Sequence, residues 1–436
     1  MNPNIPKTEQ KRVVIVGAGF AGLTLARKLS VHRNLQIVLL DKNNYHQFQP
    51  LFYQVAMAGL EPSSISFPLR KVFQSKKNVH IRVTNVRQIQ PEGRFIETDL
   101  GIIEYDFLVL ATGADTNFFG MENIIKYAMP MKSVSEALAI RNRMLQNFED
   151  ALSAQTLEER HGLMNVVIVG GGPTGVEIAG TLAEMKNHIL PKDYPELNFD
   201  MMQIYLYESS AEVLEVMSDE ASLKAKKYLT DLGVNLRLGT RITDFDGKYA
   251  YTNTGDRLRT NNLIWAAGVK ANTPSGIPQE AIGRGGRLKV NAFSQVEGFD
   301  NIFAIGDLAL MTEEKYPNGH PQLAQPAMQQ AKLLADNLAR RLKGQQMHPF
   351  RYKDLGSMAT VGRNLAVVDL PFWKFQGFFA WLTWMFVHLI SIVGVKNRLL
   401  VFINWFWNYV TYDQSLRLII KPKQPQPPVV EKVIEV

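Results

Sequence analysis

Apolar, β-branched runs alternate with a glycine turn and a helical stretch at the start of the chain. The run Arg12–Val16 predicts a strand, and the glycine turn after it opens a helix that reaches Leu29. A second predicted strand, Gln36–Leu40, ends in Asp41, and a third, Tyr105–Leu110, ends in small residues. This order of strand, glycine turn and helix is typical of the opening of a doubly wound α/β domain.

The same pattern starts again in the middle of the chain. Asn165–Val169 predicts a strand, and a second glycine turn opens a helix to about Asn187. Gln203–Tyr207 predicts the next strand, which ends in Glu208. The stretch 186–200 between them is interpreted as an inserted loop. The chain therefore carries two copies of one nucleotide-binding plan.

Two later apolar runs complete this plan. Leu263–Trp265 predicts a strand that ends in Ala266-Ala267-Gly268, as the third strand of the first copy ends in Ala111-Thr112-Gly113. Small residues at these places let the backbone pass close to a cofactor. Asn301–Ile305 predicts a strand that returns to the first domain and ends in Gly306-Asp307.

The last part of the chain has a different pattern. Phe375–Val395 is a run of 21 residues without a charge, and Leu399–Tyr412 is rich in aromatic residues. We expect amphipathic helices that dock on one leaflet, because the Trp and Tyr residues suit the membrane interface. A membrane span is an alternative, since 21 residues can cross a bilayer core of about 30 Å, and a soluble core helix is another. Residues 421–436 are expected to form a loose tail.

Both glycine turns have the spacing of a dinucleotide site. In the first, Gly17 permits the tight turn, Gly19 lets a pyrophosphate approach the backbone, and Gly22 lets the helix pack on the strand. Asp41 stands at a strand end, where a carboxylate can bond ribose hydroxyls. Alternatively, this glycine turn has only a structural role and binds no nucleotide.

The second turn, Gly170-Gly171-Gly172-Pro173-Thr174-Gly175, follows the same logic, with Glu208 as its acid. A carboxylate there favours NAD(H), because it would repel the 2′-phosphate of NADP(H). Alternatively, Glu208 merely ends a strand. Two such motifs predict two dinucleotides, one tightly held and one exchanging.

Composition narrows the chemistry further. The 436 residues are 46% hydrophobic, which allows two or three domains with cores of their own. The net charge of +7 is compatible with anionic lipid or a nucleotide, and no nucleic-acid motif is present. With no cysteine, thiol chemistry and Cys-ligated metal sites are excluded. The eight histidines show no paired-ligand spacing, so no metal site is expected.

Several segments together resemble the type II NADH dehydrogenases, the single-subunit NADH:quinone oxidoreductases of the two-dinucleotide-binding-domain flavoprotein superfamily. The glycine turns and Gly306-Asp307 are shared across the superfamily, although this Asp could also be a plain helix cap. The segments closer to the family are Asn44–Ala56, Gly172–Glu177, Ala324–Gln329 and Gly394–Arg398 with Asn404-Trp405. Ala324–Gln329 matches the AQxAxQ quinone-site motif and is the most discriminating. The resemblance covers roughly residues 10–420.

This resemblance implies an α/β fold with two Rossmann-like dinucleotide-binding domains, for FAD and NADH, plus a C-terminal helical membrane-anchoring region. The expected parts are an FAD-binding domain at 10–115 with its return segment at 291–345, an inserted NADH-binding domain at 116–290, and the anchoring region at 346–420. The implied FAD-binding residues are Gly17, Gly19, Phe20, Ala21, Gly22, Asp41, Lys42, Gln49, Val86, Ala111, Thr112, Gly113, Gly306, Asp307, Ala324 and Gln325. Those implied for NADH are Gly170, Gly172, Pro173, Thr174, Gly175, Glu177, Glu208, Ala267 and Gly268.

Three residues are candidates for catalysis. Glu177, two residues after the last motif glycine, would orient NADH or relay a proton; alternatively it is a first-turn acid that complements the helix dipole. Gln325 and Gln329 share one face of a helix predicted over Gln325–Lys343. Both would line a slot where a quinone carbonyl meets the flavin. Pro326 suits the first turn of this helix, whose N-terminus would stabilise the anionic reduced flavin.

The expected protein is peripheral, on the cytoplasmic face of a bacterial inner membrane, with a membrane quinone and the lipid bilayer as partners. A homodimer is left open, and nothing indicates proton pumping, since no polytopic bundle with buried acids is present. One alternative is a soluble NADH-dependent flavoprotein that reduces a redox protein partner. Another is a non-enzymatic flavoprotein that acts as a redox sensor or scaffold.

Overall fold

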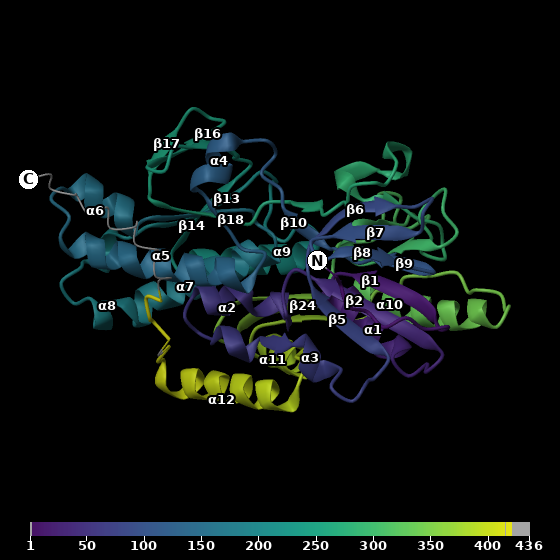
Figure 1. The fold of residues 1–436 in the computed structure, drawn as a ribbon. Helices are drawn as coiled ribbons and strands as arrows, with labels where there is room; N and C mark the ends of the chain where they lie inside the picture. The colour runs from purple at the N-terminus through teal and green to yellow at the C-terminus, as the bar shows by residue number, and fades with distance from the viewer. Residues whose placement is uncertain (1, 415, 421–436) are drawn as a thin grey trace, which may run out of the picture.

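The computed structural model describes residues 2–414 and 416–420, and the tail predicted at 421–436 lies outside these residues. Two parallel sheets, each of five strands, form the two halves of the molecule (Figure 1). The first has the order β21(Ile302–Ala304)-β9(Phe107–Leu110)-β1(Lys11–Val16)-β2(Leu35–Asp41)-β5(Val79–Val83). The second has the order β11(Met129–Pro130)-β18(Asn262–Trp265)-β12(Val166–Val169)-β13(Ile204–Glu208)-β14(Val234–Leu238). The repeated pattern of strand, glycine turn and helix in the sequence thus forms two similar α/β halves.

Alternation along the buried strands decides what covers each face of the first sheet. Val13 and Ile15 of β1 pack with helices α1 (Phe20–Leu29) and α10 (Ala324–Leu342). Val14 and Val16 point the other way. They pack towards a small antiparallel sheet of β6 (Val86–Gln90), β7 (Phe95–Thr98) and β8 (Gly101–Glu104).

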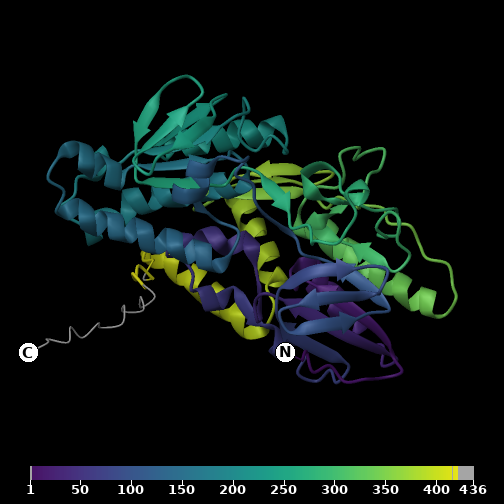
Figure 2. The same cartoon turned by 45° about the horizontal axis from the view of Figure 1, so that its top comes forward.

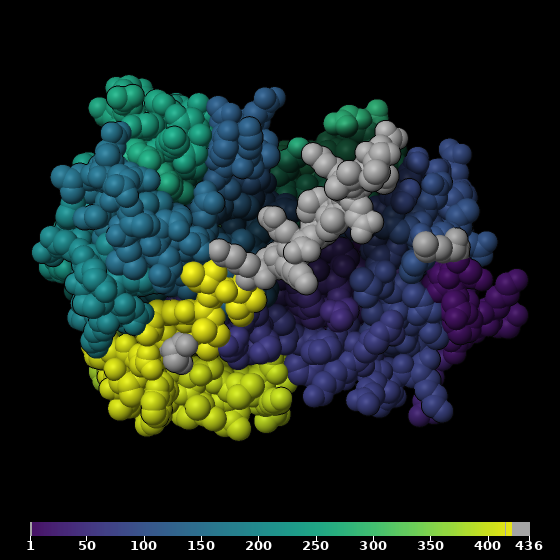
Figure 3. All heavy atoms as spheres, turned by 60° about the vertical axis from the view of Figure 1, so that its left-hand side comes forward, coloured from purple at the N-terminus to yellow at the C-terminus, as the bar shows by residue number. Residues whose placement is uncertain are grey.

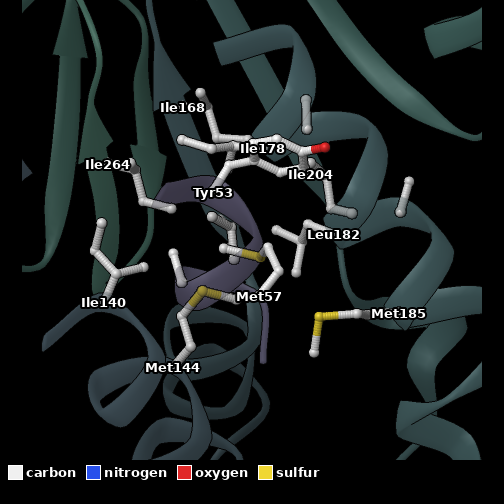
Figure 4. Close-up of a cluster of buried hydrophobic side chains, with 14 of the residues drawn as sticks. Tyr53, Met57, Ile140, Met144, Ile168, Ile178, Leu182, Met185, Ile204 and Ile264 are labelled. Atoms are coloured by element: carbon white, nitrogen blue, oxygen red, sulfur yellow. The ribbon is translucent and has the colours of Figure 1, made fainter. Parts of the chain in front are cut away.

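The second sheet is covered in the same manner. One face packs against α5 (Val134–Leu152) and α7 (Pro173–His188), and α9 (Asp219–Asp231) contacts β14. The other face meets the sheet of β15 (Ile242–Phe245), β16 (Tyr249–Thr252) and β17 (Arg257–Arg259). Helix α2 (Phe52–Ala56), from the first half, inserts between α5 and α7. Figure 4 shows side chains of this shared core: Tyr53, Met57, Ile140, Met144, Ile168, Ile178, Leu182, Met185, Ile204 and Ile264.

The C-terminal region starts with an antiparallel sheet of β23 (Ser357–Gly362), β24 (Leu365–Asp369) and β25 (Lys374–Gln376). Two helices follow, α11 (Phe378–Ser391) and α12 (Val395–Thr411). Figure 2 shows α11 running between the two halves, with α12 along the edge of the molecule. No helix of the described residues combines the length and apolar character needed to span a membrane.

Several expectations differ from the structure. The uncharged run 375–395 is not the single helix of the span and core-helix alternatives, because its start pairs in β25 and Ile392–Gly394 separates α11 from α12. The stretch 186–200 is not simply a loop, since α7 continues to His188 and a short helix, α8 (Leu190–Asp193), follows. The strand predicted from Tyr105 begins at Phe107, because the Tyr105 N–H donates to Arg94 near the β7–β8 hairpin.

The crossing of α7 and β23 generates a stability prediction. A Cβ on Gly180 would lie 1.5 Å from the Val361 carbonyl oxygen, a backbone atom that cannot rotate away. Gly180→Ala should therefore push β23 from α7 and lower the free energy of unfolding by about 1–3 kcal/mol, the range of overpacking in a close-packed core. Thermal unfolding measures this, with Lys226→Ala on exposed α9 as a control. An unchanged melting temperature for Gly180→Ala would contradict the close contact.

Candidate functional site

The first glycine turn connects β1 to α1 without room for side chains at two of its three glycines. Gly17 has φ +100°, and a Cβ there would lie 2.3 Å from the Ala111 carbonyl oxygen. A Cβ on Gly22 would lie 1.8 Å from the Gly17 oxygen. At Gly19, by contrast, a Cβ would meet no atom within 4 Å. The open side of the turn is therefore at Gly19, where a phosphate can approach the free N–H groups of a helix N-terminus.

Asp41 fixes this turn from the end of β2. One carboxylate oxygen accepts the Ala18 N–H at 2.7 Å, and the other accepts the Asn43 N–H at 2.7 Å. Burial raises the pKa of Asp41, while these hydrogen bonds oppose the rise. The acid therefore holds the middle of the glycine turn and stays near the expected ribose position.

The second turn repeats this arrangement. A Cβ on Gly175 would lie 1.9 Å from the Gly170 oxygen, whereas at Gly172 it would meet nothing within 4 Å. Pro173 and Thr174 begin α7, and proline suits the first helical turn because its missing N–H has no partner there. The open point of each turn is thus the second motif glycine.

Glu208 occupies the same place at the end of β13. Its carboxylate accepts the N–H of Gly171, the N–H of Ser210 at 2.8 Å and the hydroxyl of Ser209 at 2.9 Å. Gly171 is the counterpart of Ala18, so both acids bind the N–H of the second motif residue. The longer sequence spacing of Glu208 leaves its position unchanged.

The small-residue segments lead into two crossover strands. Gly113 is followed by β10 (Ala114–Thr116) and Gly268 by β19 (Val269–Ala271), and these strands pair antiparallel. Thr112 donates its hydroxyl hydrogen bond to the Asn272 carbonyl at 2.6 Å, which ties the two connections together. The carbonyl of Ala267 accepts from the Trp265 indole at 3.0 Å. The β10–β19 pairing and the Thr112 bond therefore connect the two halves that carry the glycine turns.

Asp307 provides a test of whether a flavin nucleotide fits the first half. Its side chain accepts no hydrogen bond from any of the described residues. Burial raises the pKa of Asp307, and the charges of Lys132 and Arg287 oppose this. Asp307 is half-buried and its carboxylate is free to accept hydrogen bonds, which the hydroxyl groups of a flavin nucleotide could donate. Together with the open position at Gly19, this residue fits a bound flavin dinucleotide.

Other implied flavin positions lie around the same turn. Phe20 and Ala21 begin α1. A Cβ on Gly306 would lie 3.2 Å from the Ala21 Cβ and 3.4 Å from the Ala327 Cβ. The structure thus brings the glycine turn, Gly306 and the start of α10 together, as the sequence predicts.

Three positions lie further out. Lys42 is exposed directly after β2, and its charge lowers the pKa of Asp41. Gln49 begins a short 3₁₀ turn before α2. Val86 begins β6 and packs against the core beneath the first sheet. Their contact with a cofactor stays a prediction.

Glu177 lies inside the protein rather than on an exposed first helical turn. It is 8% exposed, on α7, beside the backbone of Thr360 in β23 and the indole of Trp384 in α11. The Trp384 N–H faces Glu177 without forming a hydrogen bond of normal geometry. Burial raises the pKa of Glu177 well above its usual value. Burial therefore favours the uncharged form of Glu177 relative to an exposed glutamate.

The two motif glutamines contact the segment before β23. Gln325 donates its amide N–H to the Gly356 carbonyl at 3.1 Å, while its amide oxygen is buried without a partner. Ala324 begins α10 beside it. Gln329 is bound at both ends to the backbone of Lys353, at 2.8 and 3.1 Å. Of these two glutamines, only Gln325 therefore has an amide oxygen without a partner.

Sequence reasoning missed Gln330 and His46. The buried amide oxygen of Gln330 accepts the Gly306 N–H at 2.7 Å, so Gln330 fixes the turn before Asp307. The His46 ring bonds the Ala18 carbonyl at 3.0 Å and packs edge-on against Phe20. Helical periodicity could have identified Gln330, because it falls on the apolar stripe of α10; His46 has no such signal.

Comparisons with known proteins agree with this geometry. The family model for pyridine nucleotide-disulphide oxidoreductases matches residues 11–331, and the NDH2 C-terminal domain model matches residues 355–411. A type II NADH:quinone oxidoreductase of Mycobacterium tuberculosis is 34% identical over 418 residues, which cover 92% of this chain and 89% of that protein. A type II NADH:quinone oxidoreductase of Staphylococcus saprophyticus is 28% identical, over 82% of this chain and 89% of that protein.

A solved structure of NDH2 from Plasmodium falciparum in complex with NADH has the same fold. Its TM-score is 0.86 at 22% identity, and the match covers 95% of this chain and 100% of that one. The match includes the C-terminal region as well as the two nucleotide-binding halves. The chain therefore belongs to the pyridine nucleotide-disulphide oxidoreductase family and, within it, to the type II NADH:quinone oxidoreductases.

Proposed function

We propose that this protein oxidises NADH and passes the electrons through FAD to a membrane quinone, while docked on one leaflet of a membrane. The observation that carries this proposal is the pair of glycine turns, each open at its second glycine and each fixed by a carboxylate. They provide one site for a resident flavin and one for an exchanging nicotinamide. The net reaction, NADH, a proton and quinone to NAD⁺ and quinol, takes up one proton.

FAD would be held by the first half and NADH by the second. Gly19, Asp41 and Asp307 would bind the pyrophosphate, the ribose and the ribityl–phosphate region of FAD. Glu208 supports NADH over NADPH, because a 2′-phosphate would approach a carboxylate that is already fixed. Bound flavin supplies the electron transfer, and the protein positions both partners around it.

Gln325 is the better candidate of the two motif glutamines for the quinone site. One of its two amide N–H groups donates to the Gly356 carbonyl, whereas its amide oxygen has no partner and can accept a hydrogen bond. The amide oxygen suits the hydroxyl of a quinol or an N–H of the flavin, and the second amide N–H could donate to a quinone carbonyl. Gln329 would shape the site indirectly, through Lys353.

Membrane docking is supported by the surface of α11 and α12. Their outward side chains form an apolar patch whose members are 38–73% exposed. Its members are Phe378, Phe379, Leu382, Phe386, Val387, Ile390, Leu399, Leu400, Phe402, Ile403, Phe406, Trp407 and Val410. Such a patch on an amphipathic helix pair fits the interface of one leaflet. The cytoplasmic face and a homodimer are parts of the proposal that rest on the family resemblance.

The main alternative is a soluble reductase of a redox protein. The apolar patch disfavours it, because a soluble protein rarely exposes so many aromatic and aliphatic side chains side by side. A non-enzymatic flavoprotein is disfavoured by Glu177, a buried acid on α7 whose pKa is raised by burial. A perturbed acid beside the nicotinamide turn is typical of a working site.

The hydrogen bonds of Gln325 and Gln329 generate a prediction about reaction rates. Gln325→Ala should slow reoxidation of the reduced flavin by quinone at least tenfold, since one buried hydrogen bond of about 1.5 kcal/mol is lost. Bleaching of the flavin by NADH should be little changed. Rapid mixing under anaerobic conditions measures both steps. Gln329→Ala is the matched control and should have the smaller effect; equal losses in both steps would remove Gln325 from the quinone site.

Burial of Glu177 generates a prediction about pH. Its folded pKa lies well above the usual 4.5, so the folded protein keeps a proton that the unfolded chain releases. The contribution of Glu177 to stability should therefore fall as pH rises above about 4.5. Glu177→Gln removes this decline. The melting temperature of the variant minus that of wild type should therefore increase from pH 5 to pH 9. A constant difference over this range would show that Glu177 is not held protonated.

The apolar patch generates a prediction about membrane attachment. Phe402→Glu with Phe406→Glu should move the protein from the membrane to the soluble fraction, because each charge opposes insertion of α12. Ile102→Glu is the matched control, since Ile102 is equally exposed, at 58%, but lies on β8. Fractionation after high-salt washing measures the effect. Release of the control as well would show that membrane attachment is not specific to α12.

A further inference from the structure

A cleft of about 120 Å³ lies where α7 meets β23, α11 and α12. Its walls are largely aromatic, and its charged lining residues are Arg363 and Glu184. Sites for drug-sized ligands usually measure about 300–1,000 Å³. The cleft therefore suits a small polar group rather than a whole cofactor. It opens beside the C-terminal helices, which form one patch of the surface next to the second half (Figure 3).

Arg363 is held in a fixed orientation in this cleft. Its guanidinium lies 3.3 Å from the ring centre of Tyr412 and 4.9 Å from that of Tyr409. One of its N–H groups donates to the Asn408 carbonyl at the end of α12. Among the described residues, the guanidinium makes no other hydrogen bond. A planar, pre-oriented cation with free N–H donors is well suited to a phosphate oxygen.

Glu184 does not cancel this charge. It lies on the inner wall, where its carboxylate accepts the backbone N–H of Arg363. Burial raises the pKa of Glu184, although the charge of Arg363 opposes the rise. Because this carboxylate binds the backbone N–H, the guanidinium of Arg363 keeps donors available in the cleft.

The residues around the cleft and on the neighbouring apolar patch indicate which kind of molecule could bind in the cleft. Trp381 of α11 stacks on Tyr409 with ring centres 5.3 Å apart. Phe406 and Val410, on neighbouring turns of α12, are 61% and 63% exposed. Trp and Tyr rings favour the level of the lipid headgroups. If α12 docks on a leaflet, Arg363 lies at the level of the phosphates and Phe406 beside the acyl chains.

We propose that this cleft binds the phosphate of a phospholipid headgroup, with Arg363 as the anion-binding residue. The proposal rests on the proposed membrane docking and adds to it a defined lipid site. The acyl chains would lie along the exposed side of α12, next to Phe406 and Val410. Free phosphate is at least as negatively charged but makes none of this apolar contact, so it would bind far more weakly.

Native mass spectrometry of the flavin-loaded protein, purified in mild detergent with phosphatidylglycerol, tests the site directly. Wild type should keep one phospholipid per chain. Arg363→Gln should keep about tenfold less or lower, because charge-assisted hydrogen bonds are lost. Lys396→Ala, an equal loss of charge on α12 outside the cleft, should keep the lipid. Flavin content and bleaching by NADH report folding. Equal lipid retention in Arg363→Gln and wild type would overturn the proposal.

Wild-type protein provides a second test that needs no variant. It should bind vesicles of phosphatidylglycerol more tightly than vesicles of digalactosyldiacylglycerol, which has no phosphate. Millimolar inorganic phosphate should not displace the retained lipid. Equal binding to both vesicles, or displacement by phosphate, would contradict a phospholipid site. Failure to bind either vesicle would instead contradict the docking on which the proposal rests.

Discussion

The close contact of strand, glycine turn and helix is the constraint on which both nucleotide sites depend. Gly17 and Gly22 in the first half, and Gly170 and Gly175 in the second, leave no space for a Cβ. A side chain there would separate the helix from the strand and carry the helix N-terminus away from the ligand. The acid at the end of the next strand then binds the turn itself, so it is placed by the same backbone that it stabilises.

Helix α7 joins the second glycine turn, the proposed NADH site, to the C-terminal region. Its first turn belongs to the second glycine turn, Glu177 faces β23 and α11, and Gly180 lets β23 cross it. The far end of the helix lines the cleft that contains Arg363. One helix therefore links the proposed NADH site, a buried acid and the surface proposed to meet the membrane. Through α7, the C-terminal helices are therefore in contact with the element that begins at the proposed NADH site.

Much of this arrangement could be predicted from the sequence, because glycine spacing and β-branched runs are local signals. Both turns, their acids, the crossover segments and the start of α10 were identified in this way. The burial of Glu177 could not be, since its neighbours Thr360 and Trp384 are far away in the chain. The same holds for Gln329, which resembles a site residue but binds Lys353. The break at Ile392–Gly394 was hidden by uniform hydrophobicity, because composition does not reveal where a helix ends.

The central claim is that one flavin accepts electrons from NADH and delivers them to quinone. The most direct measurement is the visible flavin absorbance of wild-type protein in the absence of oxygen. Addition of one equivalent of NADH should bleach it, and a quinone added afterwards should restore it at a catalytically competent rate. A flavin that stays oxidised with NADH, or one that is bleached but not restored by quinone, would contradict the account.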